Sequence, residues 1–388
     1  MGRGVKRRYG GAVDDAVEPF TVDVPAEAVD DLRRRLRQTR WPDAATVDDW
    51  SQGVPLDWLR EVCRYWADDH DWPACQARIN AIEQVRTVVD GLPVHLLHVR
   101  SPHPGALPLV LTHGWPGSVL EFLDLIGPLT EPEDPRDAFS VVVPSLPGYG
   151  WSGAPSAPGW GPARTADAWA EVMRRLGYDR FGAQGGDIGS FVSANLGARH
   201  PDRVVGVHLN MVVTDPPPGQ TEFDEREQRA LDRLRAFRTD GSAYSHQHRT
   251  RPQTLGYGLT DSPAGQAAWI LEKFAAWSDC DGDPVAALGI DRLLDDVSVY
   301  WFTGTATSSA RMYWEMARAP EERTPRVDVP AGVSLFPHEI FLPPRTWVQR
   351  QLTDLRTWRE HDSGGHFAAM ERPAELVADV REFFRPLR

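Results

Sequence analysis

The sequence predicts an α/β protein in which a mostly helical cap interrupts a parallel sheet and a helical extension precedes it. From residue 91 onward, short β-rich segments alternate with helical segments, which is typical of a parallel sheet with helical crossovers. The alternation stops over residues 211–322, where the apolar spacing is helical. We therefore expect a core at 91–210 and 323–388, with the cap at 211–322.

The first 90 residues lack this alternation. We expect residues 1–17 to form a flexible tail and residues 18–90 to form the helical extension. Apolar residues follow helical spacing from Val29 to Leu36 and again from Leu56 to Trp66. The dipeptide Asp90-Gly91 is a hairpin turn signal and ends the extension.

Short apolar segments flanked by turn residues predict buried strands in the core. The expected strands are 94–99, 109–112, 140–143, 181–184, 204–209, 332–336 and 355–361. The expected core helices are 165–176, 190–199 and 373–384, and those of the cap are 223–237, 264–277 and 291–301.

Charge and composition exclude several function classes. The formal net charge of −13 opposes binding to nucleic acid or to anionic membranes, because both carry the same sign. Cys63, Cys75 and Cys280 are too far apart for a metal site or a disulfide framework, and no stretch of about 18 apolar residues predicts a membrane span. We expect a cytoplasmic protein without nucleic-acid or membrane partners, as a monomer or a homodimer.

The strongest local signal is Gly185-Gly186-Asp187-Ile188-Gly189, between an expected strand and an expected helix. Small residues two positions before and after Asp187 permit a sharp turn that raises its side chain above the sheet. This is the logic of a nucleophile elbow, with Asp in place of the usual Ser. The alternative is that Asp187 caps the helix that follows.

A second signal, His113-Gly114-Trp115-Pro116-Gly117-Ser118, directly follows an expected strand. In folds with such an elbow, this loop supplies one backbone N–H of an oxyanion hole, and the residue after the nucleophile supplies the other. Trp115 and Ile188 are the candidates for these two donors. A Gly-Pro turn without function is the alternative, and we expect His113 to be structural.

A third signal, Gly364-Gly365-His366-Phe367, follows the last expected strand. A His on this loop can reach back over the nucleophile, and the chain order of nucleophile, acid and His supports that role. The acid should follow a late strand, where Glu339 could orient His366 and stabilise its cation. Asp215, after the strand that precedes the cap, is the alternative acid.

Taken together, these motifs resemble those of the microsomal-type epoxide hydrolase family, from about Pro19 onward. The segment Arg40-Trp41-Pro42 resembles the N-terminal domain of that family. The resemblance implies an α/β-hydrolase fold with an N-terminal epoxide hydrolase domain, in a soluble bacterial-type member. The matching motifs are HGWPGS at 113–118, PSLPGYGWS at 144–152, QGGDIGS at 184–190, TRPQTLGYGLTDSP at 250–263 and GGHFAAME at 364–371.

The resemblance also implies two cap tyrosines that act as acids toward the epoxide oxygen. By motif position these are Tyr244 and Tyr313. The same matching assigns the acid to Glu339 and the base to His366. From the bare sequence, other tyrosines between residues 244 and 313 are equally plausible, and Tyr300 and Tyr257 are the alternatives.

An Asp rather than a Ser at the elbow separates reaction classes. A Ser that attacked an sp³ carbon would form an ether, whereas Asp forms an ester whose carbonyl water can attack. We therefore expect Asp187 to open an apolar epoxide, with aryl epoxides among the candidates, and His366-activated water to release a vicinal diol. The expected partners are a small-molecule epoxide and water, without a metal or organic cofactor.

Ile188 departs from the family, which often has Trp at this position. The Ile variant resembles bacterial epoxide hydrolases of polyketide and enediyne pathways, which implies a role in antibiotic biosynthesis. Two other functions are compatible with part of this pattern. A haloalkane dehalogenase shares the Asp nucleophile but commonly needs an indole beside it, which Ile188 removes. A non-catalytic receptor on the same fold predicts a damaged catalytic position, whereas Asp187, His366 and an acid candidate are all present.

Overall fold

The computed structural model describes residues 15–388, which contain a nine-stranded sheet in the order β1-β2-β3-β5-β4-β6-β7-β8-β9. Antiparallel pairing joins β1 to β2, β2 to β3 and β3 to β5. From β5 to β9 along the sheet, neighbouring strands are parallel, as expected. The strands are β1 (Val17–Pro19), β2 (Gln84–Val89), β3 (Leu92–Val99), β4 (Leu107–Thr112), β5 (Phe139–Pro144), β6 (Phe181–Gly185), β7 (Val204–Leu209), β8 (Val327–Leu335) and β9 (Leu352–Glu360).

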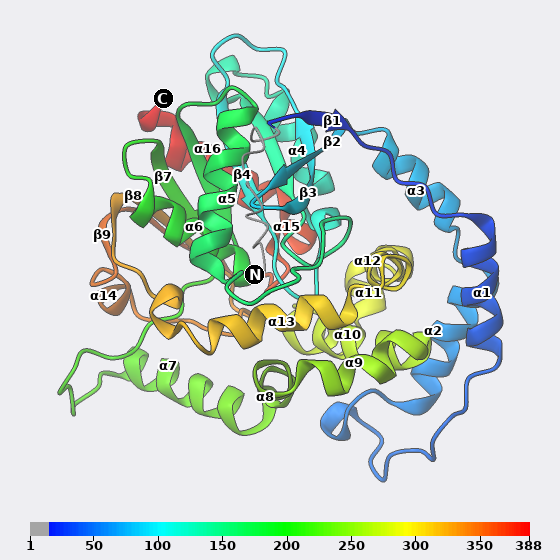
Figure 1. Ribbon diagram of the computed structural model, residues 1–388. Coiled ribbons are helices and arrows are strands. Elements are labelled where there is room, and N and C mark those ends of the chain that lie inside the picture. The colour runs from blue at the N-terminus through cyan, green and yellow to red at the C-terminus, as the bar shows by residue number, and fades with distance from the viewer. Residues whose placement is uncertain (1–14) are drawn as a thin grey trace, which may run out of the picture.

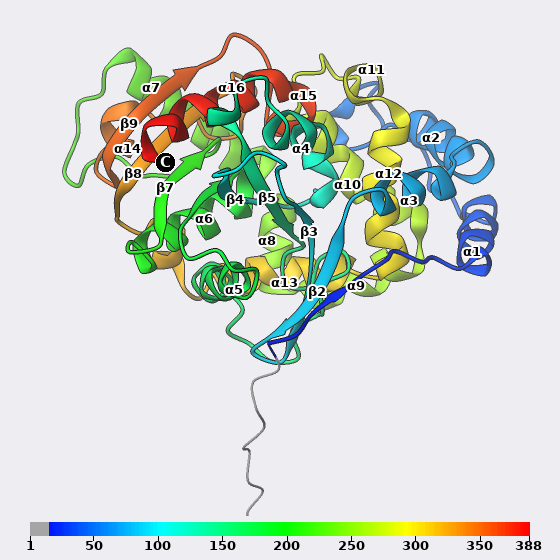
Figure 2. The same cartoon turned by 90° about the horizontal axis from the view of Figure 1, so that it is seen from above.

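Helices cover both faces of this sheet, so every residue of β5 and β7 is buried (Figure 2). Burial on both faces explains why these strands are continuous apolar runs rather than alternating ones. Among residues 15–388, no helix combines the length and hydropathy that crossing a membrane requires. One face carries α4 (Leu123–Thr130), α15 (Ala368–Glu371) and α16 (Pro373–Phe384), and the other carries α5 (Pro162–Arg175) and α6 (Asp187–Arg199).

A helical cap is inserted between β7 and β8, and Figure 1 shows α13 running along the side of the core where the cap meets it. The helices expected at 223–237, 264–277 and 291–301 are confirmed by α7, α10 and α12, whose ends agree within two residues. The cap helices are α7 (Glu225–Ala236), α8 (Ala243–Thr250), α9 (Pro252–Asp261), α10 (Pro263–Trp277), α11 (Pro284–Leu288), α12 (Ile290–Thr303) and α13 (Ala306–Met316).

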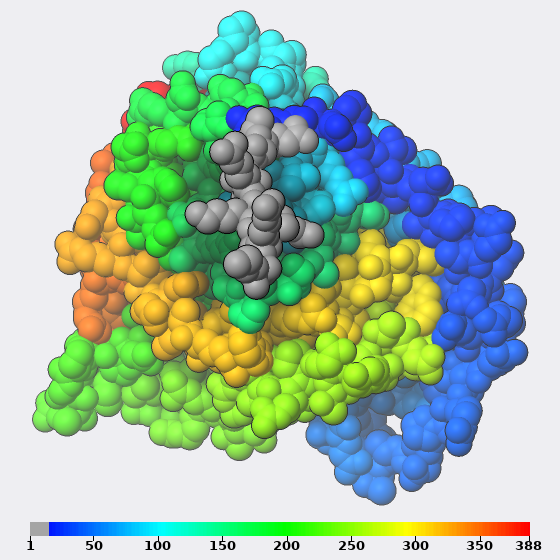
Figure 3. Space-filling model, viewed as in Figure 1, coloured from blue at the N-terminus to red at the C-terminus, as the bar shows by residue number. Residues whose placement is uncertain are grey.

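The N-terminal helices pack against the cap, and Figure 3 shows the two regions side by side on the molecular surface. Trp66 donates its indole N–H to Ser298 Oγ on α12 at 2.9 Å, and His70 Nε2 lies 2.9 Å from Asp295 Oδ1 on the same helix. The extension therefore contacts the cap through buried hydrogen bonds to α12. Its helices are α1 (Ala26–Arg37), α2 (Leu56–Asp68) and α3 (Trp72–Asn80).

The N-terminal extension also contributes two strands that were not expected from the sequence. Strand β2 takes its hydrogen bonds from β1 and β3, so its strand character depends on partners distant in the chain. Strand β1 begins at Val17, the last residue of the segment expected to be a tail, and residues 1–14 of that segment lie outside the described residues. Strands β8 and β9 also begin earlier than the strands expected at 332–336 and 355–361.

Candidate active site

Asp187 lies at a sharp turn between β6 and α6, and its backbone φ of 47° is in the left-handed region. The turn needs glycine on both sides of Asp187. A Cβ on Gly185 would lie 2.2 Å from the Gly189 carbonyl oxygen, and one on Gly189 would lie 1.8 Å from the Thr112 carbonyl oxygen. The N-cap of α6 is Gly186, without a side-chain hydrogen bond, so Asp187 does not cap this helix.

Two backbone N–H groups point at the Asp187 carboxylate. The N–H of Trp115 donates to Oδ1 at 2.9 Å, and the N–H of Ile188 also hydrogen-bonds this side chain. Burial raises the pKa of Asp187, while His366 and these two donors act in the opposite direction. Only glycine fits at position 114, because a Cβ there would lie 2.3 Å from Oδ1 of Asp187.

His366 lies between two carboxylates. Its Nδ1 is 2.8 Å from Glu339 Oε1, and its Nε2 is 3.7 Å from Asp187 Oδ2. Burial lowers the pKa of His366, but the charge and hydrogen bond of Glu339, with the charge of Asp187, outweigh it and raise the pKa to about 9. Asp215, the alternative acid, is exposed and lines the same large cavity as Asp187. The structure thus pairs His366 with Glu339.

The backbone of His366 is held by the cap. Its N–H donates to the Trp277 carbonyl at 2.9 Å, and the two rings meet edge to face at 5.1 Å between centroids. Trp277 ends α10, so this contact ties the His loop to the cap. No local sequence signal predicts it.

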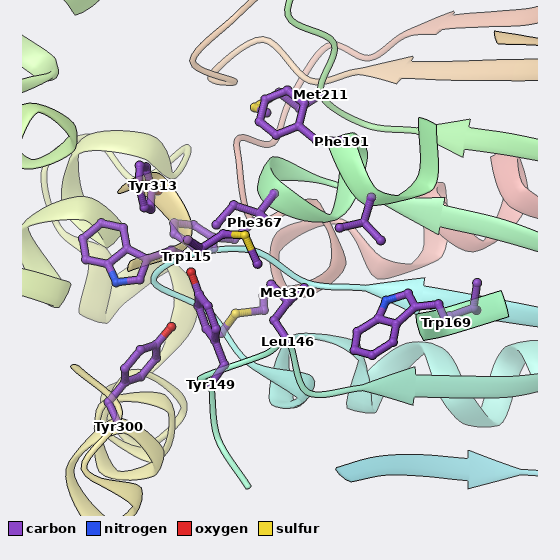
Figure 4. Close-up of a cluster of buried hydrophobic side chains, with 14 of the residues drawn as sticks. Trp115, Leu146, Tyr149, Trp169, Phe191, Met211, Tyr300, Tyr313, Phe367 and Met370 are labelled. Carbon is purple, nitrogen blue, oxygen red and sulfur yellow. The ribbon is translucent and has the colours of Figure 1, made fainter. Parts of the chain in front are cut away.

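Tyr244 on α8 and Tyr313 on α13 are both buried, with ring centroids 5.7 Å apart. The Trp115 ring stacks on Tyr244 at 5.0 Å, and Figure 4 shows Trp115 and Tyr313 where the cap meets the core. The Tyr313 hydroxyl interacts with that of Tyr244 and has no other hydrogen-bond partner in the described residues. Burial raises the pKa of both phenols, and the Asp187 charge adds to this effect.

The alternative tyrosines lie elsewhere. The hydroxyl of Tyr300 donates to the Gly117 carbonyl at 2.8 Å, and Figure 4 shows its ring below the Trp115 loop. Tyr257 is 71% exposed on the outside of the cap. Of these four tyrosines, Tyr244 and Tyr313 line a cavity with Asp187.

That cavity has a volume of about 510 Å³ and lies between the core and the cap. Asp187 and Ile188 line it on the core side, and Tyr244 and Tyr313 line it on the cap side. A site of this size suits a small organic molecule. Its other apolar and aromatic lining residues include Phe191, Met211, Leu234, Phe237, Phe341 and Trp347.

Two further acidic groups near this site were not singled out from the sequence. Asp296 on α12 is 1% exposed and accepts a hydrogen bond from the Ser118 hydroxyl at 2.6 Å, and its burial raises its pKa to about 7. Glu121 also has a raised pKa, because of burial and the nearby Asp296 charge. The only local signal is a lone carboxylate in the apolar run Val119-Leu120-Glu121-Phe122.

The sheet order, the inserted cap and the sharp turn after β6 define the chain as an α/β hydrolase, with a carboxylate at the position of the nucleophile. Two family models agree with this class. The model described as "Epoxide hydrolase N terminus" matches residues 17–122, and the one described as "alpha/beta hydrolase fold" matches residues 108–337.

Known proteins that are similar to this chain are named as epoxide hydrolases. A putative epoxide hydrolase of Stigmatella aurantiaca is 50% identical over 377 residues, which cover 96% of this chain and 86% of that protein. Epoxide hydrolase 1 of Sus scrofa is 34% identical, with coverage of 97% and 90%. The structure of Aspergillus niger epoxide hydrolase superposes with a TM-score of 0.88 at 34% identity, with coverage of 97% and 98%. The chain belongs to the epoxide hydrolase family and is an epoxide hydrolase.

Proposed function

We propose that this enzyme converts an apolar epoxide into a vicinal diol through an ester on Asp187. The observation that carries the proposal is the arrangement around this carboxylate. Oδ1 is held by the Trp115 N–H at 2.9 Å, while Oδ2 faces His366 Nε2 at 3.7 Å. Oδ2 is therefore the oxygen that attacks an epoxide carbon, and Oδ1 becomes the ester carbonyl oxygen, already on its N–H donors.

Tyr244 and Tyr313 supply the acid for ring opening. As the bond from Oδ2 to carbon forms and the carbon–oxygen bond of the epoxide breaks, one of the phenols donates its proton to the leaving oxygen. A phenol has an ordinary pKa of about 10, which suits proton donation to an alkoxide. The burial of both hydroxyls keeps them protonated until the substrate oxygen arrives.

Ester formation prepares His366 for the second step. The Asp187 charge helps to raise the His366 pKa, and that charge disappears when the carboxylate becomes an ester. The pKa of His366 then falls from its resting value of about 9, so the imidazolium releases its proton to solvent and the neutral imidazole can accept a proton from water. His366 regains a proton from solvent when the Asp187 carboxylate is restored. Glu339, 2.8 Å from Nδ1, stabilises the resulting cation.

Water attacks Cγ of Asp187, and the oxyanion at Oδ1 is stabilised by the N–H groups of Trp115 and Ile188. The bond from Cγ to Oδ2 breaks, and Oδ2 leaves with the diol. The alkoxide takes its proton from His366, and the remaining proton of the attacking water returns to the tyrosinate. The net reaction is therefore the addition of water to the epoxide to give the diol, and the enzyme returns to its starting state.

The apolar and aromatic residues of the 510 Å³ cavity, whose lining also includes Arg238, Arg249 and Arg323, support an apolar substrate, with aryl epoxides as the class to test first. Ile188 adds an aliphatic wall beside the nucleophile. The resemblance at this residue supports a substrate from natural-product biosynthesis. Dehalogenation is disfavoured because no indole follows Asp187 and because paired phenols face the nucleophile.

The test is a single turnover of styrene oxide with excess enzyme in H₂¹⁸O, followed by mass spectrometry of the peptide that contains Asp187. We expect ¹⁸O in the Asp187 carboxylate and none in the first diol. Label in the diol alone would mean that water attacks the epoxide directly, and the ester mechanism would be refuted.

A further inference from the structure

A second, much smaller cavity lies against the reacting carboxylate. Its volume is about 10 Å³, and its lining includes Asp187, His366, Asn210 and Glu121. A cavity needs about 10–15 Å³ to hold one water molecule, together with polar partners. The space therefore fits a single water beside the base and the carboxylate that the ester mechanism uses.

Glu121 lies at the junction between this cavity and a third one. The third cavity has a volume of about 200 Å³, and Asp296, Asp124 and Arg292 are among its lining residues. Glu121 lines both cavities, and its side chain is partly exposed. Water can therefore reach Glu121 on a side of the molecule that is separate from the large cavity beneath the cap.

The local backbone constrains the position of the Glu121 carboxyl group. Glu121 lies in the 3₁₀-helix Val119–Phe122, which Ser118 caps through its hydroxyl. A Cβ on Gly117 would overlap Oε1 of Glu121 at 1.5 Å, so the glycine leaves the space that the carboxyl group occupies. The same Ser118 hydroxyl donates to Asp296 Oδ1. The other carboxylate oxygen of Asp296, Oδ2, is buried and has no hydrogen-bond partner among residues 15–388.

We propose that Glu121 positions the hydrolytic water in the small cavity. Glu121 accepts a hydrogen bond from one O–H of this water, and His366 Nε2 accepts a hydrogen bond from the other. The proposal rests on the ester mechanism at Asp187. Glu121 also lines the third cavity, which lies apart from the large cavity that holds the substrate. Partial burial and the Asp296 charge raise the pKa of Glu121, which shifts its carboxyl toward the protonated form. A protonated carboxyl retains a carbonyl oxygen as the acceptor.

Separate measurement of ester formation and ester hydrolysis distinguishes this role from a purely structural one. Glu121→Gln keeps a carbonyl acceptor and the size of a protonated carboxyl, whereas Glu121→Leu removes the acceptor. Asp124→Asn is the matched control, because Asp124 lines the third cavity but not the small one and pairs with Arg292 at the surface. Rapid-quench single turnovers with styrene oxide, read by intact-protein mass, give the rates of ester formation and ester decay.

We expect Glu121→Leu to form the ester at the wild-type rate and to hydrolyse it at least about tenfold more slowly, as the loss of one positioned hydrogen bond implies. In the steady state, kcat and KM should fall together while kcat/KM is unchanged. Glu121→Gln should stay within about threefold of wild type, because the carbonyl acceptor is retained. Asp124→Asn should match wild type.

Wild-type ester decay in Glu121→Leu would overturn the proposal, as would equal losses of kcat and kcat/KM. A Glu121→Gln variant as slow as Glu121→Leu would also overturn it, since the carbonyl acceptor would not be sufficient. A failure of the ester mechanism is distinguishable. In that case wild-type enzyme itself would form no adduct and take no ¹⁸O at Asp187, and both proposals would fall together.

Discussion

Glu339→Gln removes one charge beside His366 and keeps the shape of a side chain that is 0% exposed. In the folded protein, the pKa of His366 is about 9 instead of its ordinary 6.5, although burial alone would lower it. That difference corresponds to about 3 kcal/mol of preferential stabilisation of the cation. Glu339 accounts for the larger part of this rise in the His366 pKa, and the charge of Asp187 accounts for a smaller part that is lost in the ester. We therefore expect ester hydrolysis to slow by up to about 100-fold in Glu339→Gln.

The pH dependence gives a second readout of the same substitution. Hydrolysis requires neutral His366, so its rate rises with pH through the His366 pKa and then levels off. In Glu339→Gln the uncompensated burial lowers that pKa, so the midpoint should move to lower pH while the plateau rate falls. Ester formation depends on ionised Asp187 and should change much less.

The assay is the decay of the Asp187 ester in single turnovers at a series of pH values. Asp215→Asn is the matched control, because it removes the alternative acid, which is exposed and lines the large cavity. An unchanged hydrolysis rate and midpoint in Glu339→Gln would refute the reasoning. Slow hydrolysis in Asp215→Asn would assign the role to the other acid.

Two further predictions concern ring opening and the elbow. Tyr244→Phe and Tyr313→Phe should each slow ester formation by about 100-fold, the usual contribution of a positioned acid, while ester decay is retained; normal ester formation in both variants would contradict the assignment. Gly114→Ala should abolish ester formation, because the new Cβ would lie 2.3 Å from the Asp187 side chain, whereas Gly127→Ala has open space and should match wild type. Adduct mass and thermal melts of both variants check this, and normal adduct formation in Gly114→Ala would show that the loop can shift.

The parts of the site that could be predicted from the sequence are those with local signals. The strained turn at Asp187 requires glycines at fixed offsets, and these are visible in the chain. Strands β5 and β7 of the parallel sheet are buried on both faces, so they appear as short apolar runs. The Trp115 loop follows the apolar strand β4 and the His366 loop follows β9, so their positions at one edge of the sheet could be inferred.

The tertiary structure was needed to choose between candidate residues that the sequence could not distinguish. Glu339 and Asp215 each follow a strand, and only their distances and exposure separate them. Tyr300 shares the cap with Tyr313, but its hydroxyl is occupied by the Gly117 carbonyl. These contacts join segments far apart in the chain, and local residue patterns carry no information about such distances.

By itself, the sequence determined the α/β class, the inserted cap, the elbow at Asp187 and the loop of His366, because backbone strain and burial impose local requirements on residue type. Only the tertiary structure decided that β1 and β2 join the sheet, that Glu339 pairs with His366, and that Glu121 lies between two cavities. Strand pairing, ion pairing and cavity walls depend on which distant segments pack together, and that packing is a property of the whole fold.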